Sequence, residues 1–265
     1  MPTLLVVGGG LFGSAAAAWA RRRGIEAIVF DAALDGAASP AAAGLFHQTW
    51  AGKRLAEHYQ RGLPVLEQLY DVRTVTLRHE DGRPESLLCI PPAAMLETAP
   101  VQQRVTAVGD GWLEAEGRRH HGWVYVAAGV WCEAFHPGLG VYGKTGASLH
   151  FAGERGGLIR RLGPGRQAIA FVRDPGLTYF SDGTAERDYT ADYDRQTIER
   201  AAALGLTAAP VRQTRGQRPY VPGGPVFVQL SARTWLATGG RKMGTILGAS
   251  LARRLVDEEL SGASV

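Results

Sequence analysis

The sequence predicts an α/β fold in which a parallel-sheet domain, built from both ends of the chain, carries an inserted and mainly antiparallel domain. Three observations predict it. An apolar strand over residues 3–7 runs into a glycine-rich loop and then a helix. A second glycine turn precedes the last helix, over residues 244–260. The segments between them have the patterns of short strands separated by turns. They do not alternate regularly with helices, as the strands of a purely parallel fold do.

The N-terminal elements form a strand–loop–helix–strand unit. The strand over 3–7 is a short run of mainly apolar residues with β-branched members, as is typical of strands buried on both faces. An alanine-rich helix over 14–23 is stopped by Gly24, and a second strand over 25–30 ends in Asp31. The unit has the length expected of a dinucleotide-binding fold.

Later elements are predicted from periodicity and turn residues. Residues 44–50 read as irregular, and a helix over 53–70 is expected to kink or divide at Pro64. Asp81-Gly82 predicts a turn. A helix over residues 192–204 is expected to be capped by its first aspartate. The predicted strands cover residues 72–79, 86–90, 101–108, 111–116, 123–127, 149–151, 167–172, 177–180, 227–230 and 234–238.

Composition limits the function classes. The chain has 265 residues, 45% apolar and 20% charged, as in ordinary globular proteins. A net charge of +4 suits anionic small ligands and is too small and dispersed to predict nucleic-acid binding. We expect no membrane span and no N-terminal targeting segment, and two cysteines without a CxxC pair predict neither disulfides nor a metal site. These features indicate a cytoplasmic protein.

The first glycine loop has the spacing of a dinucleotide site, Gly8-x-Gly10-x-x-Gly13. Gly8 permits the tight turn, Gly10 lets the backbone approach a pyrophosphate, and Gly13 lets the helix pack on the strand. The helix N-terminus supplies N–H groups and partial positive charge. Asp31 can accept hydrogen bonds from both ribose hydroxyls, which argues against a 2′-phosphate and hence against NADP. The alternative is an ordinary glycine-rich turn.

Five segments together resemble the FAD-dependent D-amino acid oxidase, glycine oxidase and sarcosine oxidase family. They occur in the family's order: residues 6–13 with Asp31, the alanine-rich 37–44, 124–131 ending in Ala-Gly-Val-Trp, Gly216-Gln217-Arg218-Pro219-Tyr220-Val221-Pro222, and the glycine turn 238–244. The resemblance implies a Rossmann-like FAD-binding domain with an inserted antiparallel-sheet substrate domain. We assign residues 1–50, 101–140 and 215–265 to the first, and 51–100 and 141–214 to the second.

The resemblance implies noncovalent FAD and a set of residues around it. The expected cofactor-binding residues are Gly8, Gly10, Leu11, Phe12, Gly13, Asp31, Ser39, Ala43, Gly44, Val105, Ala128, Gly129, Trp131, Arg218, Gly240, Arg241, Lys242, Met243, Gly244 and Thr245. The second glycine turn opens a long helix, whose N-terminus would stabilise negative charge on reduced flavin. Lys242 either adds to this field or is a solvated loop lysine.

Four residues are candidates for contact with substrate: Arg218, Tyr220, His47 and Lys242. In some family members an arginine at this face holds the substrate carboxylate, since a guanidinium fork fits a carboxylate with two hydrogen bonds. Arg218 could instead brace its loop or contact FAD. Tyr220, like Tyr179, is a hydroxyl donor or a packed residue. His47 is a polar lid, a base or a packing residue, and the pair His120-His121 reads as a surface turn.

The expected function is oxidation of a small-molecule amine or amino acid, by hydride transfer from the carbon bearing nitrogen to FAD. The alternatives are dehydrogenation of a 2-hydroxy acid or other substrate, and a flavin-binding subunit of a larger complex. The stretch over residues 52–100 is shorter than in most of the family. This predicts either an open site, which would suit a bulky substrate or the passage of electrons to a partner acceptor, or a site completed by another chain. A plain NAD dehydrogenase would leave the second glycine turn unexplained.

Overall fold

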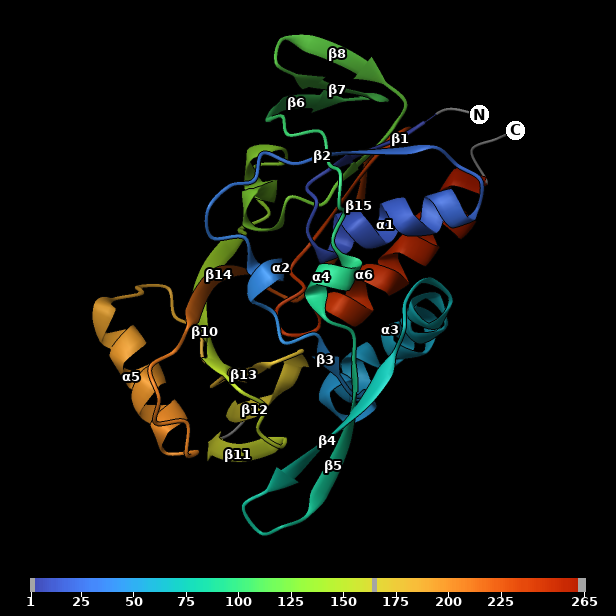
Figure 1. Cartoon of the computed structure of the whole chain (residues 1–265). Coiled ribbons are helices and arrows are strands. Elements are labelled where there is room, and N and C mark those ends of the chain that lie inside the picture. Colours follow the sequence, from blue (N-terminus) through green and yellow to red (C-terminus); the bar gives the residue numbers. More distant parts are fainter. Residues whose placement is uncertain (1–2, 164–165, 262–265) are drawn as a thin grey trace.

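The computed structural model describes residues 3–163 and 166–261, and two large sheets organise them (Figure 1). The first sheet has five strands in the order β15-β16-β9-β1-β2. Its strands are β1 (Leu4–Val7), β2 (Ala27–Phe30), β9 (Trp123–Val126), β15 (Val226–Ser231) and β16 (Thr234–Thr238). All pairs are parallel except that of β15 with β16. The predicted assembly of one parallel sheet from both ends of the chain is confirmed.

Helices from both ends of the chain pack beside this sheet. They are α1 (Leu11–Arg22), α3 (Gln48–Leu69) and α6 (Gly244–Arg253), which continues into a π-helical turn, η2 (Arg254–Leu260). These helices approach one another closely, because a Cβ on Gly62 would lie 2.5 Å from the Ile246 carbonyl oxygen and one on Gly248 would lie 2.9 Å from that of Leu11. Apolar side chains from β1, α1, α3 and α6 form the largest core cluster.

The second sheet has eight strands in the order β14-β10-β13-β12-β11-β4-β5-β3 and is antiparallel except where β11 meets β4. Its strands are β3 (Leu45–Phe46), β4 (Arg73–His79), β5 (Pro84–Cys89), β10 (Tyr142–Ala152), β11 (Leu158–Gly163), β12 (Arg166–Asp174), β13 (Leu177–Ser181) and β14 (Arg212–Tyr220). Helix α5 (Ala191–Ala202) packs on it through Ala201, against Leu149 and Phe180. The inserted antiparallel sheet is therefore also confirmed.

The remaining elements are short. A three-stranded meander, β6 (Val105–Gly109), β7 (Trp112–Ala115) and β8 (Arg118–His121), lies beyond the parallel sheet at the top of Figure 1. Helices α2 (Ala38–Ala41) and α4 (Pro92–Met95) and the 3-10 helix η1 (Gly129–Ala134) connect larger elements. Among the described residues, no helix is both long and apolar enough to cross a membrane.

Several local predictions were wrong. Gly52, whose φ of 59° and ψ of −178° are not helical, divides α3, so its second part agrees with the helix predicted over 53–70, but Pro64 lies inside that part without dividing it. Thr190, without a side-chain hydrogen bond, precedes α5, so an aspartate does not cap it. His120 and His121 belong to strand β8 instead of a turn.

Five strands were missed or shortened by the sequence patterns. β3, β8, β11 and β14 were not predicted, and β10 extends from Tyr142 although only residues 149–151 were expected. The division into two domains stays a prediction. Strand β14 crosses its boundary at residue 215, and residues 262–265 lie outside the described part of the chain.

Candidate active site

A cavity of about 710 Å³ is lined by residues from both sheets and by the loops before α1 and α6. It collects nearly all of the predicted cofactor-binding residues. Those that line it are Gly8, Gly10, Leu11, Phe12, Asp31, Ser39, Ala43, Gly44, Val105, Ala128, Gly129, Trp131, Arg218, Gly240, Arg241, Lys242, Met243, Gly244 and Thr245. Gly13 is the exception. A Cβ on Gly13 would lie 1.9 Å from the Gly8 carbonyl oxygen, so this glycine serves the packing of α1 on the loop and does not reach the cavity.

The loop between β1 and α1 is held in shape by the end of β2. Gly8 has a φ of 101°, a conformation that glycine adopts without strain. The Gly9 N–H donates to Asp31 Oδ2 over 2.6 Å, and the Ala33 N–H donates to Asp31 Oδ1 over 2.7 Å. Each carboxylate oxygen can accept further hydrogen bonds, so Asp31 keeps acceptor capacity for ribose hydroxyls at the cavity wall.

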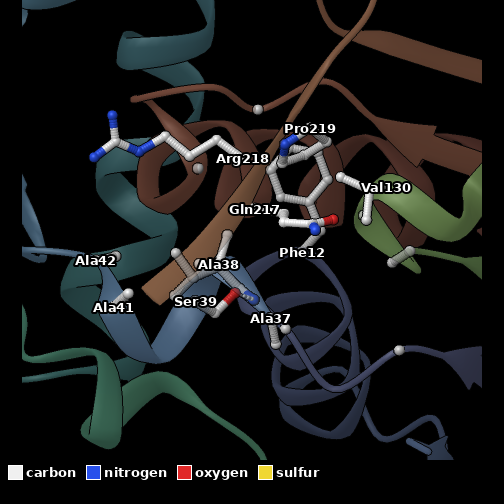
Figure 2. A pocket seen from close by; sticks show the side chains of 18 of the residues that line it. Phe12, Ala37, Ala38, Ser39, Ala41, Ala42, Val130, Gln217, Arg218 and Pro219 are labelled. Carbon is white, nitrogen blue, oxygen red and sulfur yellow. Dashed lines mark hydrogen bonds between the residues drawn. The ribbon is translucent and has the colours of Figure 1, made fainter. Parts of the chain in front are cut away.

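The alanine-rich segment joins this loop. Ser39, in α2, accepts a 3.0 Å hydrogen bond from the Leu11 N–H at the start of α1. Gly10 is in close contact with Ser39, because a Cβ on Gly10 would lie 2.9 Å from Ser39 Oγ. The first two segments of the sequence resemblance therefore meet at one helix N-terminus, as Figure 2 shows for Phe12, Ala38 and Ser39.

Helix α6 presents a second N-terminus to the same cavity. Gly240, Gly244 and Thr245 all line it, and a Cβ on Gly240 would lie 2.9 Å from the Phe12 ring. The first turn of α6 has no acidic residue and no side-chain cap. Unpaired N–H groups at a helix N-terminus carry partial positive charge, so the cavity offers anionic groups two favourable places, at α1 and at α6.

These features fit a dinucleotide. The volume lies within the roughly 300–1,000 Å³ common for ligand sites, and glycines line the two loops where a backbone must approach a phosphate or a ring. Asp31, after the end of β2, adds a carboxylate beside the first loop, and the N-terminus of α6 adds partial positive charge beside the second.

Arg218 reaches the cavity from β14. Its NH1 donates to the carbonyl oxygens of Gly183, over 3.3 Å, and Thr184, over 3.4 Å. The side chain extends away from that of Gln217, which lies toward Phe12 and Val130 (Figure 2). Neighbouring strand residues point to opposite faces. Because no carboxylate of the described residues pairs with the Arg218 guanidinium, its remaining N–H groups are available to an anionic ligand.

Lys242 lies beside Arg218 in the same cavity. Partial burial, followed by the positive charges of Arg218 and Arg166, lowers the pKa of the Lys242 ammonium, and Asp182 opposes this shift. Asp182 itself is buried and bound by Arg200 at 2.5 Å. The positive charges at this end of the cavity therefore outweigh the negative ones, which favours an anionic ligand.

Two of the predicted substrate residues lie elsewhere. His47 does not line the cavity, because its Nδ1 accepts from the Thr49 N–H at the start of α3 and so caps that helix. Tyr220 is also outside the lining, where its ring stacks on that of Tyr142 at 5.6 Å. Tyr179 does line the cavity, but its hydroxyl donates to the Ala41 carbonyl oxygen over 3.0 Å.

The sequence patterns missed the residues of the eight-stranded sheet that form the cavity floor. Gln167 and Ile169 of β12 line it, as does Ser181 of β13, two residues after Tyr179. Trp50 of α3 lines it too, and its Nε1 donates to Glu85. The spacing of two residues along β12 and β13 is the signal that would have identified one face of each strand.

Comparisons with known proteins agree with this geometry. Residues 3–81 match a family model described as FAD dependent oxidoreductase, the DAO family. Iminodiacetate oxidase from Chelativorans sp. BNC1 has a similar structure, with a TM-score of 0.75 and 18% identity over 98% of this chain and 95% of that one. Glycine oxidase from Bacillus cereus ATCC 14579 has a TM-score of 0.72 and 14% identity over 100% and 98% of the two chains.

A more distant similarity in sequence is to L-proline dehydrogenase from P. horikoshii, with a TM-score of 0.73 and 11% identity over 97% of this chain and 94% of that one. A search of the curated proteins finds no match. Residues 3–81 therefore match the DAO family of FAD dependent oxidoreductases, and the predicted fold class is confirmed; FAD as cofactor and the predicted enzyme class agree with that match.

Proposed function

We propose that this FAD-dependent oxidoreductase oxidises an amine or amino acid at the carbon that bears nitrogen. The observation that carries the proposal is Arg218, whose guanidinium pairs with no carboxylate of the described residues and lies in the same cavity as the N-terminus of α6. The bound flavin supplies a hydride acceptor. The names of the structural relatives, an iminodiacetate oxidase, a glycine oxidase and an L-proline dehydrogenase, support the choice of substrate class.

In this proposal, residues that line the cavity position the substrate and neutralise negative charge on the substrate and the cofactor. Arg218 NH1 is fixed by the carbonyl oxygens of Gly183 and Thr184, so the rest of the fork has a defined direction toward a substrate carboxylate. Such a clamp would hold the Cα–H at the flavin in a reactive orientation. Lys242 and the first turn of α6 would stabilise negative charge that develops on the cofactor.

No side-chain base is required if the amine enters without a proton. In agreement with this, the predicted base His47 caps α3 and is not part of the cavity lining. Deprotonation of the amine before it binds then makes the rate rise with pH up to the pKa of the substrate.

The test is anaerobic mixing of the FAD-loaded protein with a panel of amines, amino acids and 2-hydroxy acids. Loss of the visible flavin bands with an amine, faster at alkaline pH, is the expected result. Bleaching by 2-hydroxy acids alone, without that pH dependence, would assign the alternative dehydrogenase activity. Bands that no compound bleaches would favour a flavin-binding subunit.

Arg218→Ala separates substrate binding from cofactor binding. Loss of one or two charge-assisted hydrogen bonds predicts a Kd for the amino acid about 10- to 100-fold higher, with FAD retained. Arg218→Lys is the matched control, because it keeps the charge and loses the fork, and we expect an intermediate Kd. An unchanged Kd in Arg218→Ala would remove this residue from the substrate site.

A further inference from the structure

Strands β10 and β14 form a two-stranded ribbon, one face of which continues past the cavity. This face carries more positive charge than is needed to neutralise a single substrate carboxylate. The two strands pair in antiparallel register, with Gly146 opposite Gly216, Lys144 opposite Arg218, and Tyr142 opposite Tyr220. Directly opposed residues share a face of the sheet. The glycine pair lines the cavity, the cationic pair comes next, and the tyrosine pair ends the ribbon.

Three cations surround the tyrosine pair. The Arg187 guanidinium lies 3.9 Å from the Tyr142 ring centroid, and the Lys144 ammonium and the Arg241 guanidinium each lie 5.2 Å from that of Tyr220. The rings themselves are stacked at 5.6 Å with an interplanar angle of 20°. We call Lys144, Arg187 and Arg241 the rim cluster.

No member of the rim cluster forms an ion pair in the part of the chain that the structure describes, although most other arginines near this ribbon do. Two acidic residues flank Arg187 in the chain. Glu186 is already paired with Arg166 at 3.5 Å and accepts from the Tyr193 hydroxyl, and Asp188 forms no ion pair among the described residues.

Like charges in one cluster repel one another, and solvent and salt screen this repulsion where the side chains are exposed. Lys144 and Arg241 are each 5.2 Å from one ring centroid, so their charges are separated by no more than twice that distance. Lys144 also stands directly across from Arg218, an arrangement that is unfavourable between like charges on paired strands. Cation–π contacts offset only part of this repulsion. An anion at the cluster would remove it.

The backbone of Arg241 adds a second observation. Arg241 has a φ of 47°, which makes it one of three non-glycine residues with positive φ in the described part of the chain, and it lies in the loop between β16 and α6. Its NH2 donates to the Val221 carbonyl oxygen, over 3.3 Å, which holds the exposed side chain beside the tyrosine pair. Strained backbone of this kind concentrates at ligand sites.

We infer that the rim cluster binds a second anionic group of the substrate, a carboxylate or a phosphate several bonds from the oxidised carbon. Arg241 lines the cavity, so the cluster is continuous with the site where Arg218 would hold the first carboxylate. The substrate class is then a dianionic amino acid or amine, not a small neutral amine. This inference rests on the proposed function for its place in a substrate site.

The test uses ligands that cannot be oxidised, so that it does not depend on turnover. Glutarate, butyrate and 3-phosphonopropionate are titrated into the FAD-loaded protein, and binding is followed by calorimetry and by changes in the flavin spectrum. We expect glutarate to bind about 5- to 10-fold more tightly than butyrate, as one additional partly exposed ion pair predicts. A still tighter complex with 3-phosphonopropionate would identify phosphate as the preferred group.

Variants assign this preference to the cluster. Lys144→Gln and, independently, Arg187→Gln should reduce the preference for glutarate to less than 2-fold and leave butyrate binding unchanged. Lys53→Gln, an exposed lysine on α3, is the matched control and should keep the preference. Equal binding of glutarate and butyrate by the unaltered protein, or a preference that survives both variants, would overturn the inference.

The test of the rim cluster can succeed or fail independently of the test of the proposed function. If no amine or amino acid bleaches the flavin, the proposed oxidation fails, while the glutarate titration still decides whether the rim binds anions. If monoanionic amino acids bleach the flavin as well as aspartate, glutamate or iminodiacetate do, and Lys144→Gln affects both groups equally, the oxidation stands and the dianionic substrate class is wrong.

Discussion

Replacement of Gly13 by alanine tests how the first glycine loop is built. The added Cβ would lie 1.9 Å from the Gly8 carbonyl oxygen and 2.9 Å from Val6 Cγ1, and the first of these is backbone that cannot rotate away. Alanine gains up to about 1 kcal/mol over glycine inside a helix. Overpacking costs about 1–3 kcal/mol and more where backbone must move. We therefore expect a net loss of about 2 kcal/mol.

The loss should be visible in two measurements. For a chain of this size about 1 kcal/mol lowers Tm by roughly 2–4 °C, so the Tm of the apoprotein should fall by roughly 4–8 °C. Because Gly8 and Gly10 line the cavity, displacement of the loop should also weaken FAD binding by at least about 10-fold. Thermal melting and a fluorescence titration with FAD measure the two effects.

Gly156→Ala is the matched control. A Cβ at Gly156 would meet no atom within 4 Å, and the residue does not have a positive φ. Its Tm and FAD affinity should match those of the unaltered protein. If Gly13→Ala also behaved in this way, the close packing of α1 on the loop would not be what requires a glycine here, and the reasoning would be refuted.

Three further predictions concern buried groups. Burial, with the charges of Arg173 and Arg212, lowers the pKa of His150 to about 4, so the native state binds fewer protons than the unfolded state between pH 6.5 and 4. The free energy of unfolding should therefore decrease as the pH is lowered from 6.5 to 4, by at most about 3 kcal/mol. In urea unfolding, the free energy of unfolding of His150→Gln should depend less on pH across this window. Burial raises the pKa of the Cys132 thiol to about 12, and Cys89 is also buried with a raised pKa. Neither should react with iodoacetamide at pH 8 until the protein unfolds; rapid labelling of the native protein would contradict this. Arg200→Ala should destabilise the protein by about 3–5 kcal/mol, since it leaves the buried Asp182 carboxylate without its cation, and Asp182→Asn with Arg200→Ala should recover part of the loss in urea unfolding.

The sequence alone determined the cofactor-binding half of the protein. The strand over 3–7, the glycine loop, the helix after it and Asp31 were all predicted, because their patterns are local and the groups that they place together are near in the chain. The turn before α6 was predicted for the same reason. The cavity then collected all but one of the predicted cofactor residues, Gly13, whose role is in packing.

Strand β14 shows what the sequence left open. Its nine residues, Arg-Gln-Thr-Arg-Gly-Gln-Arg-Pro-Tyr, have little strand propensity and include a proline, and they become a strand only by pairing with β10 and standing at the edge of the sheet. That pairing decides that Arg218 faces the cavity and that Tyr220, two residues on, lies beyond it. A local pattern gives no information about such register.

The other differences have the same origin. From the sequence, His47 could be a base, a lid or a packing residue. In the structure α3 begins directly after His47, so His47 caps the N-terminus of that helix. Gln167, Ile169 and Ser181 become cavity residues because β12 and β13 pair in one particular register. Turns and helices are stabilised by neighbours in the chain, so the sequence determines them directly. The face that a strand presents to a ligand depends on partners that are distant in the chain, so only the tertiary structure decides it.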